Sequence, residues 1–359
     1  MGPTGTFPAA PAARPPWGRA LVTGGAGFLG SHLCERLTCL GVAVDCVDNL
    51  STGRAENIAP LAARPGFRFL EHDLTRPDSV AALPGPYDLV LHCACPAAPA
   101  DCRRLPLETL DAGSAGTRHA LAVARRDRAR LLFTSASAVY GDPLVSPQRE
   151  DYRGNVDPVG PDSARAEAHR FAEALVTAHV AAHGTDAGIV RLFGTYGPRM
   201  RADDGRPVPA LVARALAGAP VTLTGDGRRT HCLCYVDDVV DGVLLVAASR
   251  SVRPVNLGGG DVVTEAELAR RVIELTGSTS RVMCVGAAAD GGPRDHLPDT
   301  GLVRELFGWA PVTGWEEGLR RTIGHRTGPA LDGGPVPGRY EDIAAGSAAA
   351  GPGPGCRPC

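Results

Sequence analysis

The chain has 359 residues, a formal net charge of −2 and 44% hydrophobic residues, enough for one large α/β domain or for one such domain with a smaller lobe. No apolar run approaches the roughly 18 residues of a membrane-spanning helix, and no basic tract predicts binding to nucleic acid. All 37 basic residues are arginine, which excludes chemistry that needs a lysine amine. We expect a cytoplasmic protein, not bound to a membrane, whose eleven cysteines are free thiols.

The N-terminal part of the chain reads as a leader followed by alternating strands and helices. Residues 1–17 are rich in Pro, Ala and Gly without an apolar segment, which predicts a disordered leader and not a signal peptide. From residue 18 to 193 the predicted strands are 20–23, 42–47, 67–70, 88–92, 131–134 and 188–192, and the predicted helices are 30–40, 107–126 and 163–183. This alternation is typical of a doubly wound parallel Rossmann sheet covered by helices on both faces.

The alternation loosens after residue 194. Helices are predicted near 208–217, 236–248 and 264–276, and short strands near 221–223 and 254–257. We expect residues 194–323 to form mostly a smaller C-terminal substrate-binding lobe. Residues 324–359 are rich in Gly, Pro and Ala, which is typical of a disordered tail.

A glycine-rich turn follows the first predicted strand. Gly24 precedes a G-x-G-x-x-G spacing made by Gly25, Gly27 and Gly30, and the second predicted strand ends at Asp48, 18 residues after Gly30. These glycines permit a tight turn and a close approach of a pyrophosphate to the following helix N-terminus. An acidic residue at the end of the second strand binds the adenosine ribose and repels a 2′-phosphate. The pattern therefore predicts NAD as the cofactor.

Further motifs give this region a family resemblance. They are Val47-Asp48-Asn49, His72-Asp73-Leu74, Val139-Tyr140-Gly141-Asp142-Pro143, Tyr196-Gly197-Pro198-Arg199-Met200, Tyr235-Val236-Asp237-Asp238 and Val255-Asn256-Leu257-Gly258. From about residue 19 to 323 the chain resembles the NAD-dependent epimerase/dehydratases, which are extended short-chain dehydrogenase/reductases that modify sugar nucleotides. Within that family it is most similar to UDP-glucuronate decarboxylases. The resemblance implies NAD in the N-terminal lobe, a UDP-sugar in the C-terminal lobe, and Asp73 near the adenine.

The turn, the second strand and the resemblance together define the expected cofactor contacts. These are Gly24, Gly25, Gly27, Phe28, Leu29, Gly30, Asp48, Asn49, Asp73, Leu74 and His92. The expected substrate-binding positions are Tyr140, Gly194, Arg199, His231 and His296. Gly194 stands where the family has asparagine, and His231 and His296 stand where it has arginines. A neutral imidazole cannot reproduce the bidentate grip of an arginine on phosphate.

The catalytic positions of the family are also changed. The family uses a Tyr-x-x-x-Lys pair and a Ser/Thr hydroxyl, with the lysine lowering the pKa of the tyrosine so that its phenolate takes a proton from the sugar. This chain has Arg165, His169 and Ala136 at those positions. Imidazole titrates near neutral pH, so His169 is a candidate replacement base. The alternative is that His169 only lines a cleft or faces solvent.

Two functional hypotheses follow from this pattern. One is a divergent enzyme that acts on a sugar nucleotide or a related polar metabolite with atypical catalytic residues. The other is a catalytically inactive NAD(H)-binding pseudoenzyme that is a structural or regulatory partner of an active homologue. The family often dimerises through helices that would include 163–183, so we expect a homodimer or a hetero-oligomer with such a homologue.

Two cysteine-histidine segments raise the question of a metal. They are His92-Cys93-Ala94-Cys95 and His231-Cys232-Leu233-Cys234. Thiolate and imidazole ligands suit zinc, but neighbouring strand residues point to opposite faces of a sheet and the spacings match no standard zinc motif. We expect no metal.

Overall fold

The computed structural model describes residues 15–286 and 296–328. A seven-stranded sheet forms its centre, in the order β11-β6-β5-β4-β1-β2-β3 with every neighbouring pair parallel. The strands are β1 (Arg19–Thr23), β2 (Ala43–Asp48), β3 (Phe67–Glu71), β4 (Leu89–His92), β5 (Arg130–Ala136), β6 (Ala187–Leu192) and β11 (Val255–Leu257). The predicted fold, a doubly wound parallel Rossmann sheet, is confirmed.

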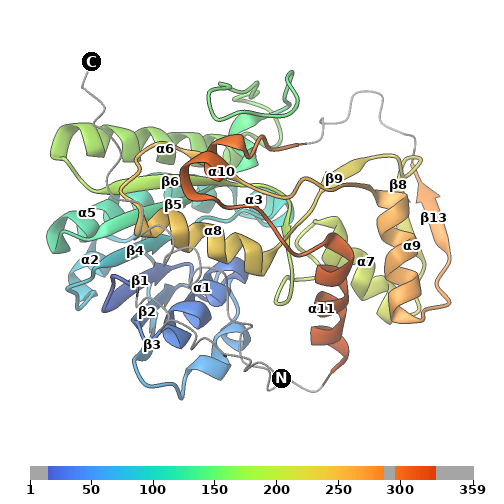
Figure 1. Ribbon diagram of the computed structural model, residues 1–359, viewed down its shortest axis with the longest axis horizontal. Coiled ribbons are helices and arrows are strands. Elements are labelled where there is room, and N and C mark those ends of the chain that lie inside the picture. Colours follow the sequence, from blue (N-terminus) through green and yellow to red (C-terminus); the bar gives the residue numbers. More distant parts are fainter. Residues whose placement is uncertain (1–14, 287–295, 329–359) are drawn as a thin grey trace, which may run out of the picture.

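Helices cover both faces of this sheet (Figure 1). Helices α1 (Phe28–Cys39) and α8 (Val236–Ala248) pack on one face, and α5 (Thr117–Asp127) and α6 (Ser163–His183) pack on the other. Successive strand side chains point to opposite faces: Leu21 of β1 belongs to the apolar cluster under α5 and α6, and Val22 belongs to the cluster under α1 and α8. Strands buried on both faces read as continuous apolar runs, which is why the sequence predicted them.

A smaller unit of helices and short strand pairs adjoins the sheet, seen at the right of Figure 1. Its helices are α7 (Pro207–Leu216), α9 (Glu265–Thr276) and α11 (Trp315–Thr327), and its strand pairs are β8 (Val221–Thr224) with β13 (Val282–Val285) and β9 (Thr230–Cys232) with β12 (Val262–Thr264). Helix α9 begins at a capping box: Thr264 Oγ1 accepts from the Glu267 amide at 3.1 Å, and the Glu267 carboxylate accepts from the Thr264 amide at 2.9 Å.

The other elements are short. They are α2 (Pro77–Ala82), α3 (Pro99–Arg104), α4 (Pro106–Asp111), α10 (Gly301–Phe307), β7 (Thr195–Tyr196) and β10 (Cys234–Tyr235). The single helix predicted at 107–126 is divided by a π-helical turn at Ala112–Gly116, with α4 before it and α5 after it.

Three boundaries differ from the expected division of the chain. The strand and helix predicted at 254–257 and 236–248 are not part of the smaller lobe, because β11 pairs with β6 in the main sheet and α8 packs on that sheet. Trp17, assigned to the leader, is buried in the core. Helix α11 continues to Thr327, beyond the expected start of the tail at 324. The rest of the predicted leader and tail, residues 1–14 and 329–359, lies outside the described residues.

Candidate active site

A cleft of about 640 Å³ lies at the carboxyl ends of β1, β2, β4 and β5. Its walls come from the β1–α1 turn, the segments after β2, β4 and β5, the start of α6, and residues between 194 and 206. The strand order reverses between β1 and β4, and open parallel sheets bind ligands in the crevice at such a reversal. The fold therefore places a ligand site where the glycine turn and the replaced catalytic positions meet.

The glycine turn forms one wall of the cleft, and its positions Gly24, Gly25 and Gly30 have no room for a side chain. Gly24 has a φ of +68°, and a Cβ there would lie 2.7 Å from the Cys93 carbonyl oxygen. A Cβ at Gly30 would collide with the Gly24 carbonyl oxygen. Helix α1 begins directly after the turn, with no side-chain cap and no acidic residue in its first turn. Its first N–H groups have no intrahelical acceptor, so this bare helix end fits a pyrophosphate.

Two carboxylates stand beside the turn. Asp48, at the end of β2, accepts from the Ala26 amide at 3.0 Å and the Leu50 amide at 2.8 Å, and burial raises the pKa of its carboxyl. Asp73 accepts from both the amide and the hydroxyl of Thr75. Burial acts in the opposite direction, but these hydrogen bonds lower the pKa of Asp73. Both acids line the cleft and are fixed by local hydrogen bonds.

Most of the expected cofactor contacts line the cleft, and two lie beneath it. The lining ones are Gly24, Gly27, Phe28, Leu29, Gly30, Asp48, Asn49, Asp73 and Leu74. Gly25 packs against the Cys34 and Cys46 sulfurs. His92 is fully buried and bonded to the Thr23 hydroxyl at 2.8 Å and the Thr117 hydroxyl at 3.1 Å. Burial lowers the pKa of His92 to about 4, so this imidazole is a neutral part of the core.

The three replaced catalytic positions meet at one place in the cleft. Ala136 ends β5, and Arg165 and His169 lie one turn apart on α6. Arg165 forms no hydrogen bond or ion pair with any described residue. His169 is 1% exposed, and neither ring nitrogen has a hydrogen-bond partner in the described part of the chain. Burial, with smaller effects from Arg165 and His92, lowers the pKa of His169 to about 3, so its imidazole is neutral at pH 7.

The serines on either side of Ala136 are already engaged. Ser135 donates to Glu173 Oε1 at 2.7 Å, and the Ser137 hydroxyl bonds to His296 Nδ1 at 2.9 Å. The methyl group of Ala136 offers no hydroxyl. The described residues therefore supply no free hydroxyl at the position where the resemblance implies one.

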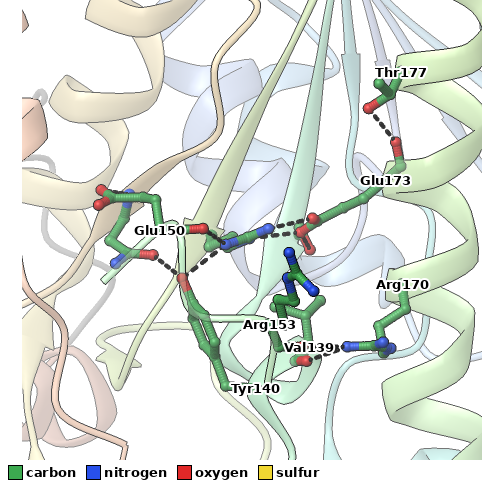
Figure 2. A network of polar contacts seen from close by, with 10 residues as sticks. Val139, Tyr140, Glu150, Arg153, Arg170, Glu173 and Thr177 are labelled. Carbon is green, nitrogen blue, oxygen red and sulfur yellow. Dashed lines mark hydrogen bonds and ion pairs between the residues drawn. The ribbon is translucent and has the colours of Figure 1, made fainter. Parts of the chain in front are cut away.

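A buried polar network anchors α6 to the sheet behind this site (Figure 2). Glu173 of α6 pairs with Arg191 of β6 through two hydrogen bonds of 2.7 and 2.9 Å. Arg191 also donates to the Tyr140 hydroxyl at 2.8 Å and to the Glu150 carbonyl at 2.9 Å. Tyr140 in turn donates to Asn256 Oδ1 of β11 at 2.9 Å. These contacts fix the helix that carries Arg165 and His169 relative to β6 and β11.

The structure brings only two of the five expected substrate-binding positions to the cleft. Gly194 and Arg199 line it. Tyr140 is buried in the network of Figure 2. His231 bonds to Glu265 at 3.0 Å, and His296 bonds to Ser137 and to the Gly141 carbonyl at 2.7 Å. None of these last three side chains lines the cleft.

Sequence reasoning missed several charged cleft residues, among them Glu108, Asp111 and the members of two ion pairs. Arg201 pairs with Asp101 of α3 at 2.6 Å, and Arg206 pairs with Asp204 at 2.9 Å; all four line the cleft. The sequence Asp204-Gly205-Arg206 does not reveal which of its side chains faces a ligand. Asp101 carried no signal, because only the fold brings α3 against the segment around Arg201.

The described residues form neither a metal site nor a membrane-spanning helix. No group of three or more His, Cys, Asp or Glu residues in the described ranges is arranged to hold a metal ion. Among the helices of residues 15–286 and 296–328, none combines the length and apolar character needed to cross a membrane.

Comparison with known proteins identifies the family of the chain. Residues 20–258 match the model of the NAD dependent epimerase/dehydratase family. The chain belongs to this family. UDP-glucuronic acid decarboxylase 3 of Arabidopsis thaliana is 39% identical over 302 residues, covering 84% of this chain and 86% of that protein. UDP-glucuronic acid decarboxylase 1 of Xenopus tropicalis is 38% identical over 305 residues, covering 85% of this chain and 71% of that protein.

Solved structures of epimerase/dehydratases agree with this assignment. UDP-glucose 4-epimerase from Thermotoga maritima, solved with UDP-glucose, has a TM-score of 0.78 and 27% identity, covering 86% of this chain and 98% of that one. UDP-glucose 4-epimerase from Thermus thermophilus, solved with NAD, has a TM-score of 0.75 and 28% identity, covering 87% and 100%. The expected family and its dependence on NAD are thus confirmed, as is the likeness to UDP-glucuronic acid decarboxylases.

Proposed function

We propose that this epimerase/dehydratase holds NAD in the cleft, with the pyrophosphate against the Gly24–Gly30 turn and the adenosine ribose against Asp48. The lack of room for a side chain at Gly24 and Gly30, the uncapped start of α1 and the carboxylate at the end of β2 support this assignment. Gly25 and His92 would support the site from beneath. Bound NAD would supply a hydride acceptor, and the residues of the chain would bind and orient it.

We propose that the cleft binds a nucleotide sugar and that the chain does not decarboxylate it. A family enzyme must remove a proton from the sugar hydroxyl as hydride leaves. His169, with a pKa of about 3, is a weak base at neutral pH, and an arginine such as Arg165 remains protonated. Ala136 supplies no hydroxyl. The observation that carries this proposal is the buried, neutral His169 beside an arginine; it favours an NAD(H)-binding pseudoenzyme that assists an active homologue.

One observation favours the second candidate, an enzyme in which His169 is the base. Both ring nitrogens of His169 are without partners among the described residues, and the side chain lines the cleft. One nitrogen therefore keeps a lone pair that no described residue uses, and a ligand would reach it only by displacing the atoms that cover the ring. Such an enzyme would act on a sugar nucleotide with atypical catalytic residues.

Purification of the chain and analysis of its bound nucleotide test these candidates. We expect NAD in the denatured extract by mass spectrometry, no change in absorbance at 340 nm with UDP-glucuronate or other UDP-sugars, and no new sugar nucleotide by chromatography. Turnover that His169→Ala abolishes would establish the second candidate. Failure to bind NAD or NADH would contradict both.

The partner of a pseudoenzyme requires a contact surface, and we propose that α4 and α6 form it. These helices pack together, and Leu107 of α4 and Phe171 of α6 are 70% and 48% exposed. Exposed apolar side chains on adjacent helices fit a dimer contact. We expect light scattering to show a dimer, of this chain or with an active homologue, that Phe171→Glu dissociates; an unchanged mass for this variant would contradict the proposed surface.

A further inference from the structure

The end of the cleft next to α6 holds an arginine that differs from the other cleft arginines. Arg199, Arg201 and Arg206 are paired with Glu35, Asp101 and Asp204, respectively. Arg165 has no such partner in the described part of the chain. The acid just before α6, Asp162, is bound instead by Arg103 at 3.1 Å.

The half-buried guanidinium of Arg165 has five N–H donors and a permanent charge, so without a protein acceptor its donors must be met by water or by ligand oxygens. Its neighbour His169, one turn along α6, has two unpartnered and buried ring nitrogens. A neutral imidazole carries one N–H donor, which can join the guanidinium in binding the same oxygen atoms. Both side chains line the cleft, and the adjacent Ala136 is small enough to leave space. Charge, donors and space all point to an oxyanion ligand.

We propose that Arg165 and His169 bind an anionic oxygen group of the ligand, a carboxylate on the sugar of a nucleotide sugar, and so select acidic over neutral ligands. This inference rests on the proposed function, since the ligand shares the cleft with NAD. A guanidinium pairs with carboxylate or phosphate oxygens through two parallel N–H donors. Arg165 stands where the family has its catalytic tyrosine, so a group that accepts a proton is replaced by a group that binds an anion.

A pair of ligands that differ in one group tests the selectivity. UDP-glucuronate carries a carboxylate where UDP-glucose carries a hydroxymethyl group. We expect calorimetry on the NAD-loaded chain to show at least tenfold tighter binding of UDP-glucuronate. Arg165→Gln should remove this preference and leave both the affinity for UDP-glucose and the NAD content unchanged. Arg320→Gln is the matched control, because Arg320 of α11 lies outside the cleft lining and pairs only with Glu316 and Glu317 of its own helix, and it should keep the preference.

The remaining outcomes separate this inference from the proposed function. Equal affinity of the native chain for the two ligands, or a preference that persists in Arg165→Gln, would overturn it. Loss of NAD from Arg165→Gln with the preference intact would show that the guanidinium serves the cofactor instead. If neither UDP-sugar binds, the nucleotide-sugar proposal fails. The unfolding temperature with free glucuronate is then compared with that in free glucose. A higher unfolding temperature with glucuronate in the native chain but not in Arg165→Gln supports the anion site. An unfolding temperature that glucuronate does not raise overturns the inference.

Discussion

The protonation of His169, which is a buried imidazole, is coupled to folding. Its pKa falls to about 3 through burial, with help from Arg165 and His92, whereas an unfolded histidine has a pKa of about 6.5. Below pH 6.5 the unfolded chain binds a proton that the folded chain does not, so stability falls as the pH falls towards 3. We expect His169→Leu to reduce the stability lost between pH 7 and pH 5 by about 2 kcal/mol.

Urea unfolding at a series of pH values measures this effect. The half-buried His32 and the buried His92, whose pKa values are also lowered, keep their own contributions in the variant, so a residual acid sensitivity remains. Val176→Ala is the control, because it removes buried apolar atoms from α6 but no titratable group, and it should lower stability without changing the pH dependence. Identical pH profiles for His169→Leu and the native chain would show that His169 is accessible to protons in the folded state.

Asp48 permits a second residue-scale prediction, on the choice of cofactor. Its carboxylate lines the cleft and is held by the amides of Ala26 and Leu50. A 2′-phosphate beside this carboxylate would be repelled. Fluorescence titration should show NADH binding at least tenfold tighter than NADPH, and Asp48→Asn should narrow that ratio to about threefold or less. Glu56→Gln, an exposed acid in the next turn, should not change it. NADPH binding as tight as NADH binding to the native chain would contradict the assigned role.

At the scale of elements, the position of α6 depends on the Glu173–Arg191 pair of Figure 2. Both side chains are largely buried, and loss of one partner leaves the other charge uncompensated. We expect Glu173→Gln to lower the free energy of unfolding by about 3 kcal/mol. Glu167→Gln on the same helix should cost about 0.5 kcal/mol or less, because Glu167 pairs with Arg170 at 3.8 Å on the surface. Equal effects of the two variants in urea unfolding would show that the buried pair does not anchor α6.

The elements also show how far the sequence could predict this fold and site. The central strands β1, β4 and β5 were predictable because each is largely an apolar run buried on both faces. The glycine turn was predictable because its spacing has a local backbone cause. The three-residue β11 was predicted in the smaller lobe, but it pairs with β6 in the main sheet. Helix α8, which packs on that sheet just before β11 in the chain, brings the strand there, and the side chains of β11 do not reveal this position. Likewise, the position of a residue in a family motif does not predict whether its side chain points into the cleft. His231 turns towards Glu265, 34 residues later in the chain, and Tyr140 turns into the core.

At the scale of the whole molecule, Arg201 is one of the residues that join the two halves of the chain at the cleft. Arg201 donates to the Thr52 carbonyl, after β2, at 3.4 Å and pairs with Asp101 of α3 at 2.6 Å. Asp204, a few residues later, accepts from the Ala100 amide at 3.2 Å through its carbonyl. These contacts join the segment after β7 to the N-terminal half at the cleft wall, so we expect them to retard cofactor release.

Arg201→Gln should therefore accelerate the loss of NAD. A hydrogen bond to a charged group contributes about 1.5–3 kcal/mol, which corresponds to a roughly 10- to 100-fold faster dissociation if the contact is broken on release. Nucleotide retained after timed gel filtration measures the rate. Arg320→Gln, which breaks only exposed pairs on α11, is the control. Equal retention of NAD by Arg201→Gln and the native chain would mean that NAD leaves without breaking the contacts of Arg201 with Thr52 and Asp101, and that the cleft opens at another place.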